Sequence, residues 1–211
     1  MNTNLNFPAP LSALAFLGTA ALLMLFVALA IGFALYRRRR ALQTVAALSG
    51  VLVVSYTAAL LLFSAASLRV IVPRGQEKYF CELDCHIAYS VVSSRFEPTQ
   101  DGAGRYIVEL QTRFDPTTIG PRRGDAPLSP NPRTAELIDE AGHQYRAYVV
   151  HGQPLTRALR PGESYRSTVV FDVPAAPSNP LLWLHSPSGT PDSLMIGNEL
   201  SPLHRKVYLQ L

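Results

Sequence analysis

Two consecutive segments, "HIAYSVVSSRFEP" (residues 86–98) and "GRYIVELQTRFDP" (residues 104–116), decide the fold of this 211-residue chain. Both are rich in Val, Ile, Tyr and Phe, which favour β-strands, and each ends in Phe, an acidic residue and Pro. The five residues between them, "TQDGA" (99–103), have the composition of a turn. We therefore predict two antiparallel strands joined at 99–103.

Further strand patterns follow toward the C-terminus. The segment 134–150 places Glu-Ala-Gly between two alternating runs, which predicts a hairpin. The segments 167–174, 181–187 and 205–211 supply three more strands. Between them, residues 115–133 contain five prolines, which predict a long ordered loop or an irregular edge. Strands at this spacing, with Pro and Gly in the turns, predict a mainly β fold, an antiparallel β-sandwich.

The segment "PGESYRSTVVFDVP" (161–174) combines a Pro-Gly-Glu turn, an alternating strand and Phe-x-Val-Pro. It resembles a late strand of many bacterial immunoglobulin-like domains. Residues 75–211 as a whole resemble the poorly characterised immunoglobulin-like family of exported and membrane-anchored proteins. The resemblance implies an immunoglobulin-like sandwich, and it transfers no catalytic residue because the biochemical role of that family is not established.

The N-terminal third of the chain is apolar. Residues 11–36 contain no charged side chain, and as a helix they would span roughly 39 Å, enough to cross a bilayer with some tilt. A second uncharged run, 41–68, ends at Arg69, and "RRRR" (37–40) separates the two runs. We therefore predict a transmembrane hairpin with spans at 11–36 and 41–68.

The orientation of this hairpin follows from its arginines. Positive charge beside a span stays in the cytoplasm, so the topology determinants are Arg37, Arg38, Arg39 and Arg40. The first ten residues lack Lys and Arg, and the first apolar run is too long for a secretory signal, so we expect it to be retained. The sequence thus predicts a two-pass protein of the cytoplasmic (inner) membrane, with residues 1–10 and the domain 69–211 on the extracytoplasmic side.

The charge distribution limits the partners and activities. All 15 acidic residues and 15 of the 19 basic ones lie at or after Arg69, so the net charge of +4 comes from the arginine run. A domain without net charge argues against a nucleic-acid partner. We expect the lipid bilayer and a second membrane protein as partners. The chain has no Gly-rich phosphate loop, no Ser-centred elbow and no metalloprotease motif, which favours a non-enzymatic role.

The only two cysteines, Cys81 and Cys85, lie in "YFCELDCHIAY" (79–89), with His86 directly after the second. In a straight strand their Cα atoms would be roughly 13 Å apart, beyond the roughly 4.4–6.8 Å that a disulfide tolerates. A disulfide therefore requires a bend at residues 82–84. Two cysteines with no other partner usually pair in an oxidising compartment, so we favour the disulfide, with a contribution of roughly 2 kcal/mol or less.

Three other interpretations of Cys81, Cys85 and His86 stay open. Two thiolates and an imidazole suit copper or zinc, and the pair resembles the binding element of copper chaperones for respiratory oxidases. Such a site needs a further ligand, with the candidates His143, His151, His185 and His204. The spacing is also a one-residue expansion of the c-type haem motif, with His86 as axial ligand and Met195 or a distal histidine as the sixth. Free or intermolecularly paired thiols are the third.

We therefore predict a membrane-anchored extracytoplasmic binding or assembly module, an accessory subunit of a larger membrane complex being one form of it. The alternative is a redox or metal-handling protein that uses the cysteine motif. Elsewhere, the segment 196–204, with Asn198, Glu199 and His204, is a candidate binding edge, and Trp183 is expected in the core.

Overall fold

A computed structural model of the 211-residue chain describes residues 1–81, 85–99, 103–121, 123–187 and 189–211. Two predictions fall on residues outside these ranges. They are the bend at residues 82–84 and the middle of the turn at residues 99–103.

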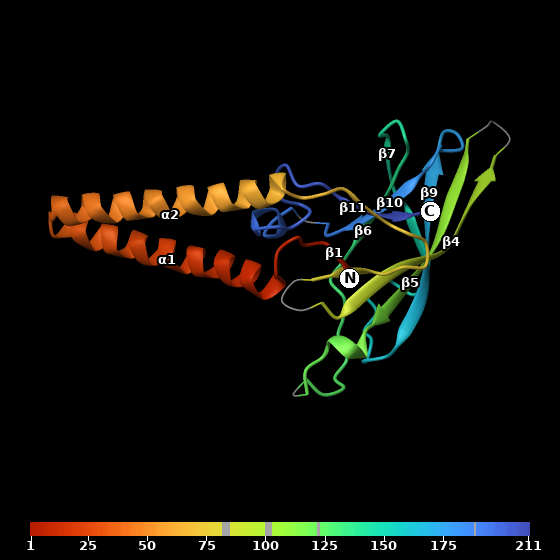
Figure 1. The fold of residues 1–211 in the computed structure, drawn as a ribbon, viewed down its shortest axis with the longest axis horizontal. Coiled ribbons are helices and arrows are strands. Elements are labelled where there is room, and N and C mark those ends of the chain that lie inside the picture. The colour runs from red at the N-terminus through yellow and green to blue at the C-terminus, as the bar shows by residue number, and fades with distance from the viewer. Residues whose placement is uncertain (82–84, 100–102, 122, 188) are drawn as a thin grey trace.

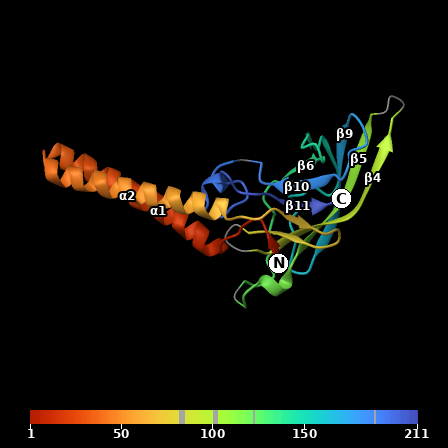
Figure 2. The ribbon, with the colours of Figure 1, turned by 45° about the horizontal axis from the view of Figure 1, so that its top comes forward.

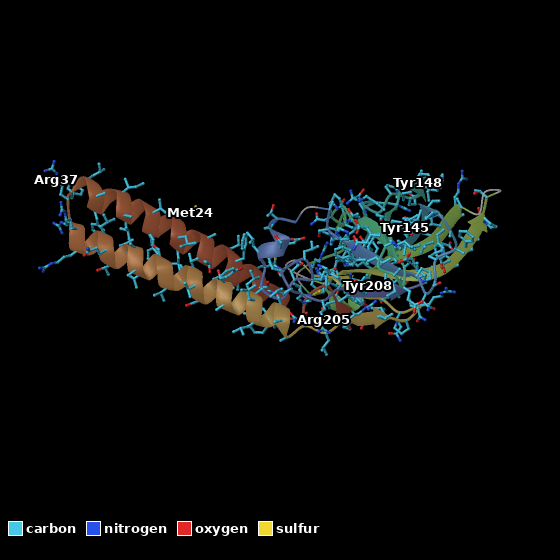
Figure 3. All side chains as sticks on the ribbon, turned by 90° about the horizontal axis from the view of Figure 1, so that it is seen from above. Met24, Arg37, Tyr145, Tyr148, Arg205 and Tyr208 are labelled. Carbon is cyan, nitrogen blue, oxygen red and sulfur yellow. A yellow bond between two sulfur atoms is a disulfide. The ribbon has the colours of Figure 1, made fainter. Side chains whose placement is uncertain are left out.

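Two helices, α1 (Ala9–Leu35) and α2 (Arg39–Ala65), form an antiparallel hairpin that projects from one end of a β domain (Figures 1 and 2). Each helix has 27 residues and is long and apolar enough to cross a membrane. α1 ends before Arg37, whose positive φ of 53° starts the turn into α2. Arg37 lies at the tip of the hairpin, far from the β domain (Figure 3). From this tip the helices diverge toward the domain (Figure 1).

The β domain is built from two sheets. The six-stranded sheet has the order β1-β3-β4-β5-β9-β8, and the five-stranded sheet has the order β2-β11-β10-β6-β7. The strand bounds are β1 Asn2–Thr3, β2 Val70–Val72, β3 Lys78–Phe80, β4 Ile87–Pro98, β5 Gly104–Phe114, β6 Thr134–Ile138, β7 Gln144–Arg146, β8 Val149–Gly152, β9 Ser164–Val173, β10 Leu181–His185 and β11 Val207–Gln210. Short 3-10 helices follow β5 (η1, Pro116–Thr118) and β10 (η2, Asp192–Leu194). The prediction of a β-sandwich preceded by two apolar helices is confirmed.

The core lies between the sheets. Alternate residues of β5, among them Val108 and Leu110, are fully buried, and Leu137 and Leu182 of the other sheet are fully buried in the same cluster. This alternation is the pattern that predicted the long strands, and it fixes which face of each strand packs inward.

The sheets are mixed, whereas the sequence predicted antiparallel pairing throughout. β1 pairs in parallel with β3 at the edge of one sheet, and β2 pairs in parallel with β11 at the edge of the other. These strands have only two or three residues, too few to show an alternating pattern. They flank the helices, so the hairpin leaves from one sheet and returns to the other.

The predicted hairpin at 134–150 is divided between the sheets. β6 and β7 pair antiparallel as expected, but β8 pairs with β9 of the six-stranded sheet. The crossing lies between Ala147, which donates to the Ala135 carbonyl, and Tyr148, which donates to the Val170 carbonyl. The second alternating run of this segment therefore closes one side of the sandwich, because its first half (β7) pairs in the five-stranded sheet and its second half (β8) pairs in the six-stranded sheet.

Candidate functional site

The N-terminal segment (residues 2–7) is built into the helix-proximal end of the sandwich, where the helices meet the sheets. After β1, the buried side chain of Asn4 binds the main chain of Cys81. Its Oδ1 accepts a hydrogen bond from the Cys81 N–H at 2.7 Å, and its Nδ2 donates to the Cys81 carbonyl at 3.4 Å. The Asn4 main-chain N–H donates to the Tyr79 carbonyl at 3.2 Å. The amide thus continues the β1–β3 pairing beyond the strand.

The other side of the N-terminal segment meets the loop that follows η2. The Glu199 N–H donates to the Asn4 carbonyl, and the Asn6 N–H donates to the Gly197 carbonyl, both at 2.9 Å. Gly197 has a φ of +79°, and a Cβ there would lie 2.6 Å from the Asn6 Oδ1 and from the Phe7 Cβ. Glycine is therefore required both for the backbone conformation and for this close approach.

The first turns of α1 pack on the same loop. Ser12 Oγ donates to the Ile196 carbonyl at 2.8 Å, and Ala9, Ser12 and Ala13 are the buried residues of α1. Their small side chains allow the helix to approach the domain closely.

The end of α2 is attached by separate contacts. Tyr56 Oη donates to the Leu194 carbonyl at 2.7 Å, which joins α2 to η2. Asn6 Nδ2 donates to the Phe63 carbonyl at 2.9 Å, and the rings of Phe7 and Phe63 meet edge to face with centroids 4.7 Å apart. Both helices and both sheets are therefore connected through the N-terminal segment and through η2 with the residues that follow it (192–199), here called the η2 loop.

A cleft of about 450 Å³ lies between α1 and the sandwich. α1 contributes Ala13, Phe16 and Leu17, and the loops after η1 and β10 contribute most of the opposite wall. The lining is mainly apolar, with Pro132, Pro187, Pro191 and Met195 on the domain side, and its polar members are Asn131, Arg133, Ser186, Asp192 and Asn198. An apolar cleft with a few polar groups is the general character of a binding site.

Arg133 is held in the domain wall of this cleft. Its guanidinium carbon lies 4.2 Å from the centroid of the Phe80 ring, and its Nη1 donates to Ser186 Oγ at 3.2 Å. The aromatic contact and the hydrogen bond fix the direction of the guanidinium, because both act on its planar group.

The cysteine motif borders the cleft as well. Cys81 and Cys85 form a disulfide, with Cα atoms 4.2 Å apart, and Cys81 lines the cleft. Since both sulfur atoms are in the disulfide, neither is the thiolate that a metal or a haem thioether would require. The disulfide therefore lies where β3, the N-terminal segment and the cleft meet.

The structure gives the predicted histidines separate environments. His86 Nδ1 lies 2.8 Å from Thr118 Oγ1, and the His86 ring stacks on Phe114. His185 stacks on the half-buried Trp183 with centroids 3.8 Å apart. His143 lies in an exposed turn beside Asp139, His151 is in edge strand β8, and His204 is buried. Within the described ranges, no three or more His, Cys, Asp or Glu side chains are grouped so as to hold a metal ion.

A buried ion pair that the sequence analysis missed joins the sheets at this end. Lys78 Nζ donates to both carboxylate oxygens of Glu199, at 2.8 and 3.0 Å, and the two side chains are 0% and 1% exposed. Lys78 also donates to the carbonyls of Leu184 and Val207 in the opposite sheet. Burial lowers the pKa of the Lys78 ammonium, and the charge of Glu199 opposes that shift. Of the predicted edge 196–204, Glu199 is therefore structural, whereas Asn198 lines the cleft.

A second charged cluster lies on the outer face of the six-stranded sheet. Arg113 Nη2 donates to Glu77 Oε2 at 2.6 Å, to Asp115 Oδ2 at 3.2 Å and to Tyr79 Oη at 3.1 Å. Tyr79 and Arg113 are both in register with Ala88, whose small side chain leaves room for them to meet across it.

The pKa values in this outer cluster favour charged carboxylates. The Arg113 hydrogen bond holds the pKa of Glu77 below its ordinary value. Burial acts to raise the pKa of Asp115, but hydrogen bonds from Tyr79, Thr117 and Arg113 outweigh burial and lower it. Burial and the bond to Asp115 raise the pKa of Tyr79, so the hydroxyl stays protonated.

Comparisons with known proteins assign no family. No protein-family model matches the chain, and no curated protein is significantly similar to it. Among solved structures, the secreted protein MPT63 of Mycobacterium tuberculosis is similar with a TM-score of 0.43 and 9% identity, over 69% of this chain and 100% of that one. The resemblance to the immunoglobulin-like family therefore stays a prediction.

Proposed function

We propose that the chain is a two-pass membrane protein whose sandwich lies on the extracytoplasmic side and binds a ligand or partner through the cleft at the membrane surface. The observation that carries this proposal is the composition of the cleft walls. One wall belongs to α1, which is long and apolar enough to cross a membrane, and the other belongs to the β domain. A binding site of this kind serves a molecule that is available at the bilayer.

The N-terminal segment supports the two-pass topology. It is hydrogen-bonded to β3 and to the η2 loop, so it lies on the same side of the membrane as the sandwich. The chain between them must then cross the bilayer an even number of times. Two apolar helices fit this requirement, and the four arginines at the tip favour a cytoplasmic position for it.

The anchoring contacts support a binding or assembly role in which the domain keeps a fixed position on the membrane. Ser12, Tyr56 and Phe63 connect the helices directly to the domain, so both helices are attached to the sandwich at its helix-proximal end. A domain held in this way keeps its cleft at a constant depth relative to the bilayer, as an accessory subunit of a membrane complex would need.

Topology reporters test the first half of this proposal. Alkaline phosphatase fused after Leu211 should be active, and the same enzyme inserted after Arg38 should be inactive, because it folds only outside the cytoplasm. The opposite pattern would sink the proposed topology.

Native mass spectrometry of the full chain in mild detergent tests the binding role. A bound species should be present in the wild type and in Leu14→Trp, and reduced in Leu17→Trp. Leu14 and Leu17 are both exposed on α1, but only Leu17 lines the cleft. Absence of any bound species from all three proteins would contradict a binding role for the cleft.

A further inference from the structure

We propose that the ligand of the cleft is a membrane lipid, which inserts one acyl chain beside Phe16 and Leu17 from the extracytoplasmic leaflet. This assignment rests on the proposed function and specifies the ligand class of the same site. It follows from the depth of the cleft, from the surfaces that border it, from its lining and from its size.

The helix length places the cleft at the edge of the hydrocarbon layer. About 20 residues of helix cross that layer, so a count from Leu35 at the arginine end reaches Phe16. The preceding turns, with the buried Ala9, Ser12 and Ala13, then lie beyond it, where they contact the sandwich. Phe16 and Leu17 are therefore at the boundary between acyl chains and headgroups.

The surfaces on both sides of the cleft continue into the lipid-facing surface. On α1, Leu17 is 58% exposed and is followed by the exposed Leu22 and Leu25. On the domain side, η2 borders the cleft and lies beside the end of α2 in both ribbon views (Figures 1 and 2). Its Leu194 is 45% exposed and its carbonyl accepts the Tyr56 hydrogen bond. Tyr56 lies within about 20 residues of the arginines, so η2 reaches the hydrocarbon edge.

The lining matches an amphiphile. Phe16, Leu17 and Met195 offer apolar surface, whereas Ser186 and Asn198 offer polar groups in the same cleft. A wholly polar solute would leave the apolar lining in contact with water, and a pure hydrocarbon would displace water from Ser186 and Asn198 without offering them a further hydrogen bond. A lipid suits both the apolar lining and the polar groups, because its acyl chain and its glycerol and headgroup oxygens enter the cleft together.

The size of the cleft favours a lipid chain over a partner helix. An α-helix is about 10 Å across and rises about 5.4 Å per turn, so it fills roughly 420 Å³ per turn. The cleft of about 450 Å³ would therefore enclose only about one turn of a partner helix. An acyl chain is much narrower and extends along the cleft, so it buries far more of its own surface in the same volume.

Photolabelling of the full chain in vesicles tests the lipid assignment. The vesicles contain phosphatidylethanolamine, phosphatidylglycerol and a few per cent phosphatidylcholine with a diazirine on one acyl chain. After irradiation, adducts should appear on the peptides that carry Pro187 and Met195, and on the bilayer-facing Met24 as an internal standard. Leu17→Trp should reduce the adducts at Met195 severalfold relative to Met24, and Leu14→Trp should leave that ratio unchanged.

Two results would overturn the lipid assignment. The first is labelling confined to the helix surface around Met24, with the peptide of Met195 unlabelled. The second is a bound species in the native mass spectrum that is a protein and is lost in Leu17→Trp. Either result leaves the proposed function standing, because the topology reporters and the dependence of binding on Leu17 test it separately.

Discussion

The adjacent residues Glu77 and Lys78 place opposite charges on opposite faces of the six-stranded sheet, and their surroundings differ sharply. Lys78 points between the sheets, where Glu199 and two main-chain carbonyls surround it and both charged side chains are at most 1% exposed. Glu77 points outward to Arg113, and that pair is 27% and 30% exposed. The inner pair is desolvated, whereas the outer cluster exchanges with water.

An ion pair therefore has different effects on stability when it is buried and when it is partly exposed. A buried pair costs desolvation energy, and its main consequence is that neither partner can be removed alone. A partly exposed cluster is screened by salt and titrates with the solution. We therefore expect the inner pair to determine whether the helix-proximal end forms, and the outer cluster to adjust its stability with pH.

Replacing Lys78 alone should be the most damaging of these changes. Lys78→Met leaves the Glu199 carboxylate buried without its counter-charge, so the free energy of unfolding should fall by about 3–5 kcal/mol. Chemical denaturation of the detergent-solubilised protein measures this loss. The double variant Lys78→Met/Glu199→Leu should lose less than the sum of the two single variants. If Lys78→Met costs no more than Arg113→Met, the distinction between the two clusters is wrong.

Glu199 lies in the loop that holds the N-terminal segment. Substitutions at two glycines, Gly197 in this loop and Gly162 elsewhere, test whether the segment docks there. Gly197 and Gly162 have φ values of +79° and +86°, but only at Gly197 would a Cβ meet Asn6 and Phe7. Gly162→Ala should cost about 1–2 kcal/mol for backbone conformation alone. Gly197→Ala should cost about 1–3 kcal/mol more because it overpacks the contact. Equal losses in thermal unfolding would show that the segment does not dock there.

Removal of the Cys81–Cys85 disulfide should lower the free energy of unfolding by a smaller amount. It closes a short loop next to Tyr79, so the chain-entropy model gives a contribution of about 2 kcal/mol. The double variant Cys81→Ser/Cys85→Ser should lose this amount, and a reductant should lower the Tm of the wild type but not of the variant. Two free thiols per chain in the unfolded, unreduced protein would contradict the disulfide.

The outer cluster should affect mainly the pH dependence of the free energy of unfolding. The pKa values of Asp115 and Glu77 are lowered in the folded protein, so their contribution is complete above the unfolded values of about 3.9 and 4.3. It is lost as the pH falls below about 4, because the folded state must then take up protons that the unfolded state already binds.

Arg113→Met provides the control for this titration. It should cost about 1 kcal/mol at pH 7, since the pair is partly exposed, and it should flatten the fall in Tm between pH 5 and pH 3. Added salt should weaken the wild type more than the variant. An equally steep fall in both proteins would assign the acid sensitivity to other groups.

The long strands could be predicted because their sequences alternate. β4, β5 and β9 each have ten or more residues, which is enough for the period of two to stand out. β1, β2 and β3 are too short for this, so the two parallel edges and the attachment of the N-terminal segment could not be foreseen. The predicted compartment and the lack of other cysteines in the sequence favour the disulfide, but nothing in the sequence indicates Asn4 as its neighbour.

The cleft and the buried pair depend on distant parts of the chain. The cleft joins α1 to residues near 132 and 195, and Lys78 meets Glu199 across 121 positions. In the sequence, Lys78 precedes Tyr79 and Phe80 like any polar residue at a strand start. Once residues 78–80 form a strand, Lys78 shares the inward face of Phe80, but no local pattern shows that Glu199 lies opposite it.

The contact between Asn6 and Phe63 has a practical consequence for protein engineering. The Asn6 side-chain Nδ2 and the Phe63 carbonyl oxygen are 2.9 Å apart, so the segment that precedes α1 touches the last turns of α2. A gene in which a short Gly-Ser bridge replaces residues 8–63 should therefore yield a water-soluble sandwich that retains both parallel edge strands. Such a product would lack the α1 wall, and it would offer crystallographers the domain without the cleft.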